Sequence, residues 1–174
     1  RGFGKRHLAV MQNYFVLIGP ADDPARITET TTESAALRAI AESGARFLSR
    51  GDDSGTHKRE RYLWAEAGID LGAASGSWYL EAGQGMGASI NLAVQLNAYL
   101  LSDISTWRAF GNKSNHRLLF KDTSDSLLNR YSVLTIKPTH CPSAEHNGAN
   151  QFADWLTSKE GQQQIAAFLL DGQQ

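Results

Sequence analysis

The sequence Arg50-Gly51-Asp52-Asp53-Ser54-Gly55-Thr56-His57 decides the fold of this chain. It follows a short apolar run at 45–48 and precedes a helical pattern, so we expect a strand that ends at Arg50 and a helix that begins near Ser54. The first N–H groups of a helix lack intrahelical partners, and the helix dipole favours an anion there. Arg50 adds a planar, permanently charged donor that suits a tetrahedral oxyanion. The sequence therefore predicts an anion-binding turn, although an ordinary helix start capped by Asp53 or Ser54 has the same pattern.

A second turn, which contains three glycines, repeats this arrangement. A strand pattern ends at Glu81, the segment 83–87 reads Gly-Gln-Gly-Met-Gly, and a helical pattern begins near Met86 or Gly87. In open α/β sheets, ligands bind at the carboxyl ends of the strands, where the N-termini of helices point. We therefore expect the two turns to aim backbone N–H groups at one ligand. The alternative is a turn that serves tight packing of a helix on a sheet. The segment does not match the dinucleotide-binding fingerprint, whose acidic ribose partner would fall on Leu101.

The rest of the chain alternates between strand and helix patterns. Apolar runs predict strands at 14–20, 45–49, 77–81, 98–102, 117–120 and 132–136. Helical periodicity predicts helices at 32–43, 54–67, 86–97 and 150–170, with a short helical turn at 105–110. The last helix places on one face, which we expect to be buried, Phe152, Trp155, Leu156, Ile165, Phe168 and Leu169. This order is typical of an α/β fold in which helices flank a mixed sheet.

Composition excludes several classes of protein. The 174 residues carry a net charge of −1 at pH 7 and the pI is near 6.6, so we do not expect a nucleic-acid-binding protein. No apolar run is long enough to span a bilayer. The first six residues do not have the pattern of a signal peptide. Cys141 is the only cysteine, which rules out an intrachain disulfide.

Two other chemistries are suggested by the residues. Ser54 and His57 with a nearby aspartate could form a hydrolase triad, but no GxSxG turn surrounds the serine. His140, Cys141 and His146 could bind zinc, but no fourth ligand stands at a standard spacing. We expect neither, and we expect His57 to lie on the surface in the first helical turn.

The charged residues near the first turn are expected to have structural roles. Asp52 would turn away from the anion and orient Arg50, and Asp53 would cap the helix. The run Lys58-Arg59-Glu60-Arg61 is expected to be a solvated helix face.

The two turns together resemble a known family. The first turn, followed by Trp78-Tyr79-Leu80-Glu81-Ala82-Gly83-Gln84-Gly85-Met86-Gly87-Ala88, looks like the tungstate-binding component of bacterial ABC importers. The segments 11–20 and 155–162 also resemble that family, so the resemblance covers nearly the whole chain. It implies the type 2 periplasmic-binding-protein fold, in which two α/β lobes close on an oxyanion.

The resemblance also implies a division of the chain and a set of ligand-binding residues. Residues 1–19 would be a strand that crosses between lobes with a residual first-lobe segment, 20–125 the second lobe, and 126–174 a return segment with the C-terminal helix of the first lobe. The N-terminal part of the first lobe, with its anion contacts, would lie upstream of Arg1 or be absent. The implied ligand-binding residues are Arg50, Ser54, Gly55, Thr56, Gly85, Met86 and Gly87.

The expected function is transport rather than catalysis. We expect no catalytic residue, no cofactor and no metal ligands, and we expect tungstate or molybdate to be bound by hydrogen bonds. By resemblance, the protein would be the substrate-binding component of an ABC-type importer, periplasmic or extracellular, with a membrane permease as partner. The pattern Arg-x-Asp-x-Ser-Gly-Thr also resembles phosphate-binding components, so phosphate or sulfate is the alternative ligand, and an anion-sensing module without a transporter is the alternative role. If the first lobe is missing, the cleft face of the remaining lobe is exposed and could promote self-association.

Overall fold

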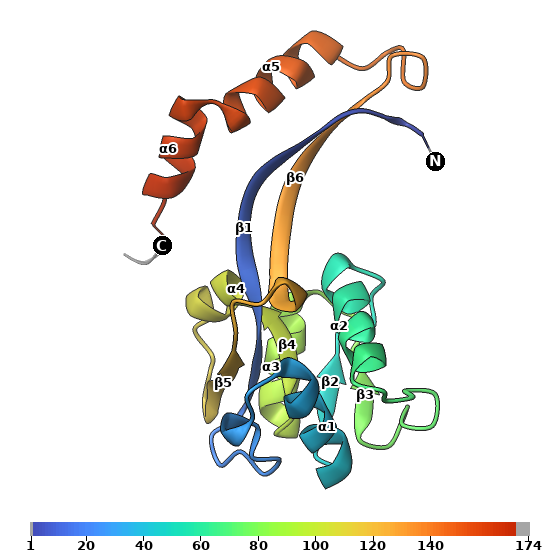
Figure 1. The fold of residues 1–174 in the computed structure, drawn as a ribbon, viewed down its shortest axis with the longest axis vertical. Helices are drawn as coiled ribbons and strands as arrows, with labels where there is room; N and C mark the ends of the chain where they lie inside the picture. Colours follow the sequence, from blue (N-terminus) through green and yellow to red (C-terminus); the bar gives the residue numbers. More distant parts are fainter. Residues whose placement is uncertain (1, 170–174) are drawn as a thin grey trace. The chain divides into compact units, whose positions relative to one another are not determined.

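The computed structural model describes residues 2–169, which form a mixed α/β fold as expected. In chain order (Figure 1) the elements are β1 (Gly4–Pro20), the 3-10 helix η1 (Ile27–Glu29), α1 (Glu33–Ser43), β2 (Phe47–Ser49), α2 (Gly55–Glu66), β3 (Tyr79–Glu81), α3 (Met86–Leu96), β4 (Leu100–Asp103), α4 (Ile104–Ala109), β5 (His116–Lys121), the 3-10 helix η2 (Asp125–Leu127), β6 (Leu128–Ile136), α5 (His146–Thr157) and α6 (Lys159–Ala167). Within residues 2–169, no helix combines the length and the apolar character that crossing a membrane requires.

The chain divides into two compact units. The larger unit is Tyr14–Leu128, and the smaller one combines Arg1–Asn13 with Asn129–Gln174. These limits lie close to the predicted lobe limits at 19/20 and 125/126. The residues at 14–20 fall in the larger unit, because they form the central strand of its sheet. The assignment of the segments to two lobes stays a prediction.

The larger unit is built around the second half of β1. This segment pairs in antiparallel fashion with β4 on one side and with β5 on the other. Strands β2 and β3 pair in parallel, with Ser49 opposite Glu81. The start of β4 continues this arrangement, since the amide of Leu48 donates to the carbonyl of Tyr99 at 2.8 Å. Both predicted turns therefore leave the same end of one parallel strand pair.

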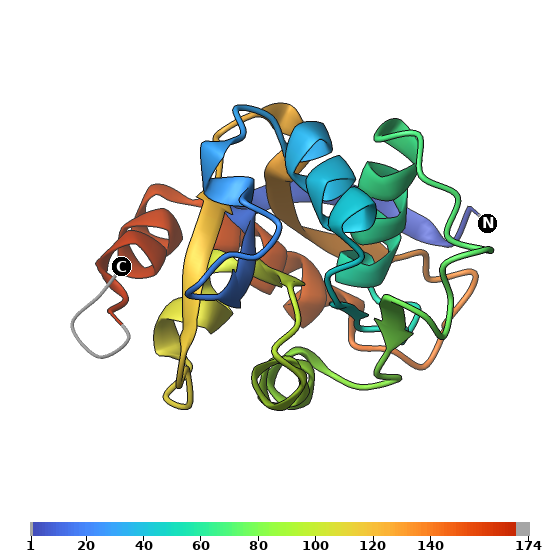
Figure 2. The ribbon, with the colours of Figure 1, turned by 90° about the horizontal axis from the view of Figure 1, so that it is seen from below.

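The side chains of β1 alternate between two cores. Phe15 and Leu17 join the side chains of α1 and α2, whereas Val16 and Ile18 join those of α3 and α4. Figure 2 shows α1 and α2 on one side of the strands and α3 on the other. Successive side chains of a strand point to opposite faces. Because both faces are covered, the strand is apolar at every position of 15–18, as is typical of buried strands.

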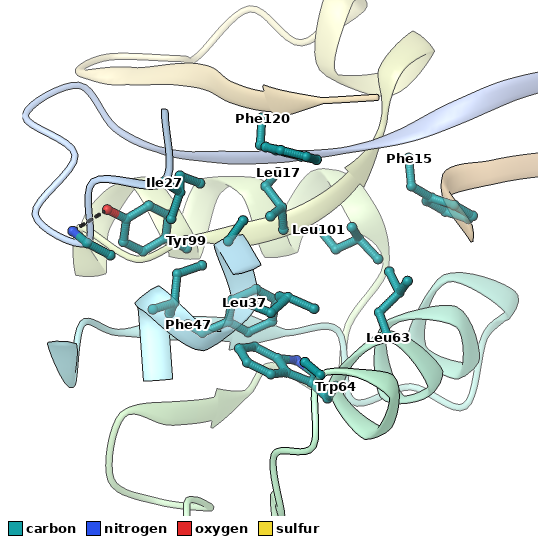
Figure 3. Close-up of a cluster of buried hydrophobic side chains, with 14 of the residues drawn as sticks. Phe15, Leu17, Ile27, Leu37, Phe47, Leu63, Trp64, Tyr99, Leu101 and Phe120 are labelled. Carbon is teal, nitrogen blue, oxygen red and sulfur yellow. Dashed lines mark hydrogen bonds between the residues drawn. The ribbon is translucent and has the colours of Figure 1, made fainter. Parts of the chain in front are cut away.

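The larger of these two cores contains several aromatic rings (Figure 3). Phe47 of β2 packs edge-to-face on Trp64 of α2, with ring centroids 5.0 Å apart. Tyr99 is fully buried, and its hydroxyl donates to Asp23 at 2.8 Å and accepts from the amide of Ala25 at 2.9 Å. Because buried polar groups need partners, these bonds fix the loop at 21–26 against the core.

The smaller unit contains the first half of β1 together with β6, α5 and α6. Strand β6 pairs with β1, Arg6 of β1 forms an ion pair with Asp154 of α5, and the side-chain amide of Gln162 donates to the carbonyl of Val10 at 3.0 Å. Strand β1 begins at Gly4, well before the predicted start at 14. Its early residues alternate between half-buried and exposed, so they form no apolar run that would mark a strand in the sequence.

The single helix predicted at 150–170 is wrong, because α5 and α6 meet at Ser158. The Ser158 hydroxyl caps α6 by accepting from the amide of Gly161 at 3.1 Å. A Cβ on Gly161 would lie 2.0 Å from the carbonyl oxygen of Trp155. Gly161 therefore permits a tight bend between two helices. Leu170, the last residue of the predicted helix, lies outside the described residues.

The predicted burial of the apolar stripe on this helix is also wrong. The exposed fractions of four of its side chains lie between 40% and 67%; these are Phe152, Trp155, Phe168 and Leu169. Leu156 and Ile165 are half-buried, and the buried residue of α5 is Ala153. A strand pair with two helices has too few layers to enclose a helix face.

Candidate anion-binding site

The first turn leaves β2 through a backbone that only glycine tolerates well. Gly51 has φ +61°, and a Cβ there would lie 2.9 Å from the Cβ of Glu81 and 3.4 Å from the amide nitrogen of Gly83. A left-handed conformation is costly for residues with a side chain. Glycine therefore allows the backbone of the first turn to lie directly against the second turn.

Two backbone hydrogen bonds hold the turns together. The amide of Ala82 donates to the carbonyl of Ser49 at 2.9 Å, and the amide of Gln84 donates to the carbonyl of Arg50 at 3.2 Å. These bonds continue the parallel pairing of β2 and β3 beyond the last strand residues. The predicted convergence of the two turns is thus a feature of the structure.

Helix α2 begins with a side-chain cap and free amides. Ser54 is the N-cap, and its Oγ accepts from the amide of His57 at 3.3 Å. The first helical bond runs from the amide of Lys58 to the carbonyl of Ser54, so the N–H groups of Gly55 and Thr56 have no partner within the helix. Gly55 is exposed, and Thr56 and Ser54 are half-buried. The Ser54 hydroxyl also interacts with the Asp52 carboxylate, so this first turn can offer two amides and the Thr56 hydroxyl to an anion.

The expectation that Asp53 caps α2 is wrong. Asp53 has φ +57° and lies before the helix, and its carboxylate pairs with Lys58 at 3.1 Å. Its side chain is well exposed, with 87% of its surface accessible. Ser54 is the N-cap because its backbone, unlike that of Asp53, has the extended conformation that precedes a helix.

Helix α3 begins without any side-chain cap. Gly85 is the N-cap, and the amide of Ser89 donates to its carbonyl at 3.0 Å. The amides of Met86 and Gly87 come before this first bond, so they too lack intrahelical partners. The side chain of Met86 is buried in the core, with 9% exposed, which leaves only its backbone for a ligand. A Cβ on Gly87 would lie 3.7 Å from the ring of Phe110, the residue that follows α4, which is an ordinary contact distance.

Arg50 contacts the start of α2 through its side chain and the second turn through its carbonyl, and it retains a free donor. Its Nη2 forms an ion pair with Asp52, and its Nη1 donates to the Thr56 hydroxyl at 3.4 Å. Its Nε is buried and, among the described residues, has no hydrogen-bond partner. A buried guanidinium N–H without a partner is costly, and a bound anion would remove that cost.

Asp52 has the orienting role that we expected. One carboxylate oxygen accepts from Arg50 and the other from the amide of Ser54 at 3.2 Å. Burial acts to raise the pKa of Asp52, but the hydrogen bonds from Ser54 and Arg50 outweigh it and lower the pKa to about 2. Asp52 is therefore a carboxylate at neutral pH and fixes the direction of the guanidinium.

Two expectations for α2 are corrected by burial. His57 is buried, with 8% exposed, and its Nδ1 accepts from the amide of Asp53 at 3.0 Å, so it is not a surface residue. Glu60 is 2% exposed and accepts from the Tyr79 hydroxyl at 2.7 Å, so it does not belong to a solvated face. Of the charged residues around it, Lys58 and Arg61 are exposed and Arg59 is half-buried. Glu60 faces inward because its position places it one turn before Trp64, on the buried side of the helix.

The residues considered for other chemistries have different partners. The Ser54 hydroxyl bonds the backbone of His57 rather than its ring, so no nucleophile–base pair forms there. The His140 ring stacks on Phe3 with centroids 3.7 Å apart, and the Nε2 of His146 lies 2.8 Å from the carbonyl oxygen of Cys141. In the part of the chain that the structure describes, no three metal-binding side chains come together.

Comparisons with known proteins agree with this architecture. Residues 1–160 match the model of a family described as a PBP superfamily domain. The chain is 35% identical over 170 residues to the tungstate-binding protein TupA of Peptoclostridium acidaminophilum, which covers 96% of this chain and 58% of that protein. It spans between 51% and 63% of the length of the curated relatives that it matches.

Two solved structures are also similar. The tungstate ABC transporter from Geobacter sulfurreducens superposes with a TM-score of 0.85 at 40% identity, over 96% of this chain and 69% of that one. The tungstate-binding protein TupA from Desulfovibrio alaskensis G20 gives a TM-score of 0.79 at 37% identity, over 99% and 69% of the two chains. The family model covers nearly all of the described residues, and the chain therefore belongs to the PBP superfamily, that of the periplasmic binding proteins.

Proposed function

We propose that this chain binds a tetrahedral oxyanion, tungstate or molybdate, between the starts of α2 and α3. The observation that carries the proposal is the hydrogen bond from the amide of Gln84 to the carbonyl of Arg50, which joins the two turns. It brings two positive helix ends and one guanidinium to one place. The proposed ligand-binding residues are Arg50, Ser54, Gly55, Thr56, Gly85, Met86 and Gly87.

The number of available hydrogen-bond donors is sufficient to offset the free energy of desolvating a dianion. An ion moved into a low-dielectric interior loses about 20 kcal/mol of solvation in the ideal limit and still several kcal/mol after relaxation. Each charge-assisted hydrogen bond returns about 1.5–3 kcal/mol, so about five are needed. Arg50 Nε and the four amides of the two helix starts provide five. The Thr56 hydroxyl already accepts a hydrogen bond from Arg50, which leaves its proton to donate.

The relatives support both the ligand and a role in transport. Proteins of 35% to 40% identity are named for tungstate binding or tungstate transport. We infer that this chain supplies a large part of the substrate-binding component of an ABC importer. It would act outside the cytoplasmic membrane, deliver its anion to a permease, and perform no catalysis and need no cofactor. The N-terminal part of the first lobe would complete the site, and an open cleft face would favour self-association.

Phosphate and sulfate are the competing ligands. A protonated phosphate needs an acceptor in its site, and Asp52 is the nearest carboxylate in the first turn. Both of its oxygens already accept from Arg50 and Ser54, which leaves it less able to take a proton from the ligand. The two hydrogen bonds that Asp52 already accepts therefore favour a ligand without a proton, such as tungstate or molybdate. The same preference would hold if the chain served as an anion sensor without a transporter.

Isothermal titration with tungstate, molybdate, sulfate and phosphate tests the proposal. We expect tungstate and molybdate to bind and the other two anions to bind much more weakly. An Arg50→Ala variant should lose at least tenfold in tungstate affinity, whereas Arg61→Ala removes the same charge from an exposed position of α2 and should bind like the wild type. Equal affinity of Arg50→Ala and wild type would refute the assignment of Arg50. Tighter binding of phosphate than of tungstate would refute the ligand.

A further inference from the structure

A buried acid lies behind the proposed anion site. Glu60 is 2% exposed, and its Oε1 accepts from the hydroxyl of Tyr79 at 2.7 Å. Burial raises the pKa of Glu60 to about 7, although the hydrogen bond from Tyr79 acts in the opposite direction. A carboxyl group that must be desolvated in this way costs stability, so its presence calls for an explanation.

The side chains around Glu60 come from three elements whose ends lie at the proposed site, α2, β2 and β3. Glu60 lies on α2, whose start carries the first helix amides, and Tyr79 lies on β3, which leads into the glycine turn. Ser49 lies on β2 directly before Arg50, and its hydroxyl also interacts with Glu60 and Tyr79. The acid therefore connects the three elements whose ends supply the anion donors.

A chain of hydrogen bonds runs from this acid to the backbone of the first turn. The Oγ of Ser49 accepts from the amide of Gly51 at 3.2 Å. Because the hydroxyl accepts there, its proton is free to be donated towards the pair of Glu60 and Tyr79. A change at Glu60 can thus reach the peptide that places Arg50.

We propose that Glu60 is a positioning residue for the oxyanion, and that its proton is required for full anion affinity. The inference rests on the proposed function and adds a control to it. An ionised Glu60 would place a buried negative charge behind a site that must receive a dianion, where screening by water is weak. It would also draw the Ser49 hydroxyl towards itself, and so alter the acceptor for the Gly51 amide.

Linkage gives the size of the effect. If tungstate binding raises the pKa of Glu60 by one unit, the ionised form binds tungstate tenfold more weakly than the protonated form. Other groups near Glu60 are Glu81 of β3, whose charge also acts on it, the Trp64 indole and, one turn earlier on α2, His57. The test must separate Glu60 from these neighbours.

Tungstate affinity measured by titration calorimetry from pH 6 to 8.5 tests the inference, since tungstate stays a dianion over this range. We expect the wild-type affinity to fall about tenfold across the range. Glu60→Gln should remove most of this fall, and Glu66→Gln, which removes an exposed carboxylate from the same helix, should keep it. Tyr79→Phe removes a donor that favours the ionised acid, so its fall should move to higher pH.

A second measurement does not depend on any variant. The Glu60 carboxyl carbon can be followed by NMR in the wild-type protein, and its pKa should rise when tungstate is present. If the wild type binds tungstate but Glu60→Gln keeps the full pH dependence, the dependence belongs to another group and the role of Glu60 is refuted. An unchanged Glu60 pKa on binding refutes it as well. If the wild type binds no oxyanion at any pH, the proposed function itself falls, and this inference falls with it.

Discussion

The contact between the two turns makes Gly51→Ala the most informative single substitution. Gly51 has φ +61°, and its added Cβ would lie 2.9 Å from the Cβ of Glu81. Gly44 has nearly the same conformation, with φ +65°, but no atom lies within 4 Å of an added Cβ there. Gly44→Ala therefore introduces the same backbone strain at the end of α1, without any contact.

The difference between the two variants measures the packing of the turns. Left-handed backbone at alanine costs about 1–2 kcal/mol, and that should be the whole loss of unfolding free energy for Gly44→Ala. Gly51→Ala adds a contact with the end of β3 and the glycine turn, where overpacking costs about 1–3 kcal/mol more. We therefore expect Gly51→Ala to lose about 2–5 kcal/mol in total.

Urea unfolding, followed by tryptophan fluorescence, gives both free energies, and calorimetry gives tungstate affinity for the same proteins. Gly51→Ala should also bind tungstate at least tenfold more weakly, because separating the turns stretches the bond from Gln84 to Arg50. Gly44→Ala should keep wild-type affinity. Equal losses of stability in the two variants, with affinity intact in both, would show that the turns do not depend on each other.

Three further predictions concern the buried acid, the helix junction and the helix caps. Folding raises the pKa of Glu60 from 4.5 to about 7, so the folded state binds more protons between these pH values. The unfolding free energy should therefore fall by up to about 3 kcal/mol as the pH rises through this window. Urea unfolding at pH 5 and pH 8 should show a smaller fall for Glu60→Gln than for the wild type, and an equal fall in both proteins would contradict this. Gly161→Ala places a Cβ 2.0 Å from the carbonyl oxygen of Trp155, so it should lower the Tm by several degrees, and an unchanged Tm would argue against the tight bend. Ser54→Ala and Thr32→Ala each remove a helix cap and should each cost about 1 kcal/mol in urea unfolding, but only Ser54→Ala should weaken tungstate binding.

Much of the larger unit could be predicted from local sequence. The continuous apolar run at 14–20 is the part of β1 that is covered on both faces, and Thr32 and Gly44 begin and end α1 as caps. The convergence of the two turns followed from a general rule for parallel strands. Gly51 and Gly83 have positive φ in the structure, a conformation that favours glycine.

The remaining features depend on contacts between residues that lie far apart in the sequence. Glu60 stands among charged residues and reads as solvent-exposed, and its burial follows from Tyr79, nineteen residues later. The first half of β1 has no apolar run, and its pairing with β6 decides its conformation. The bend at Ser158 lies within a helical pattern, because serine and glycine are tolerated inside helices as well as at their ends.

The most direct test of the account is an NMR titration of backbone amides with tungstate. If the two helix starts bind one anion, the amide signals of Gly55 and Thr56 should shift together with those of Met86 and Gly87, at the same tungstate concentrations. The amide of Gly44, at the far end of α1, should stay unchanged. Shifts confined to one helix start, or shifts at neither while tungstate binds, would contradict the shared site.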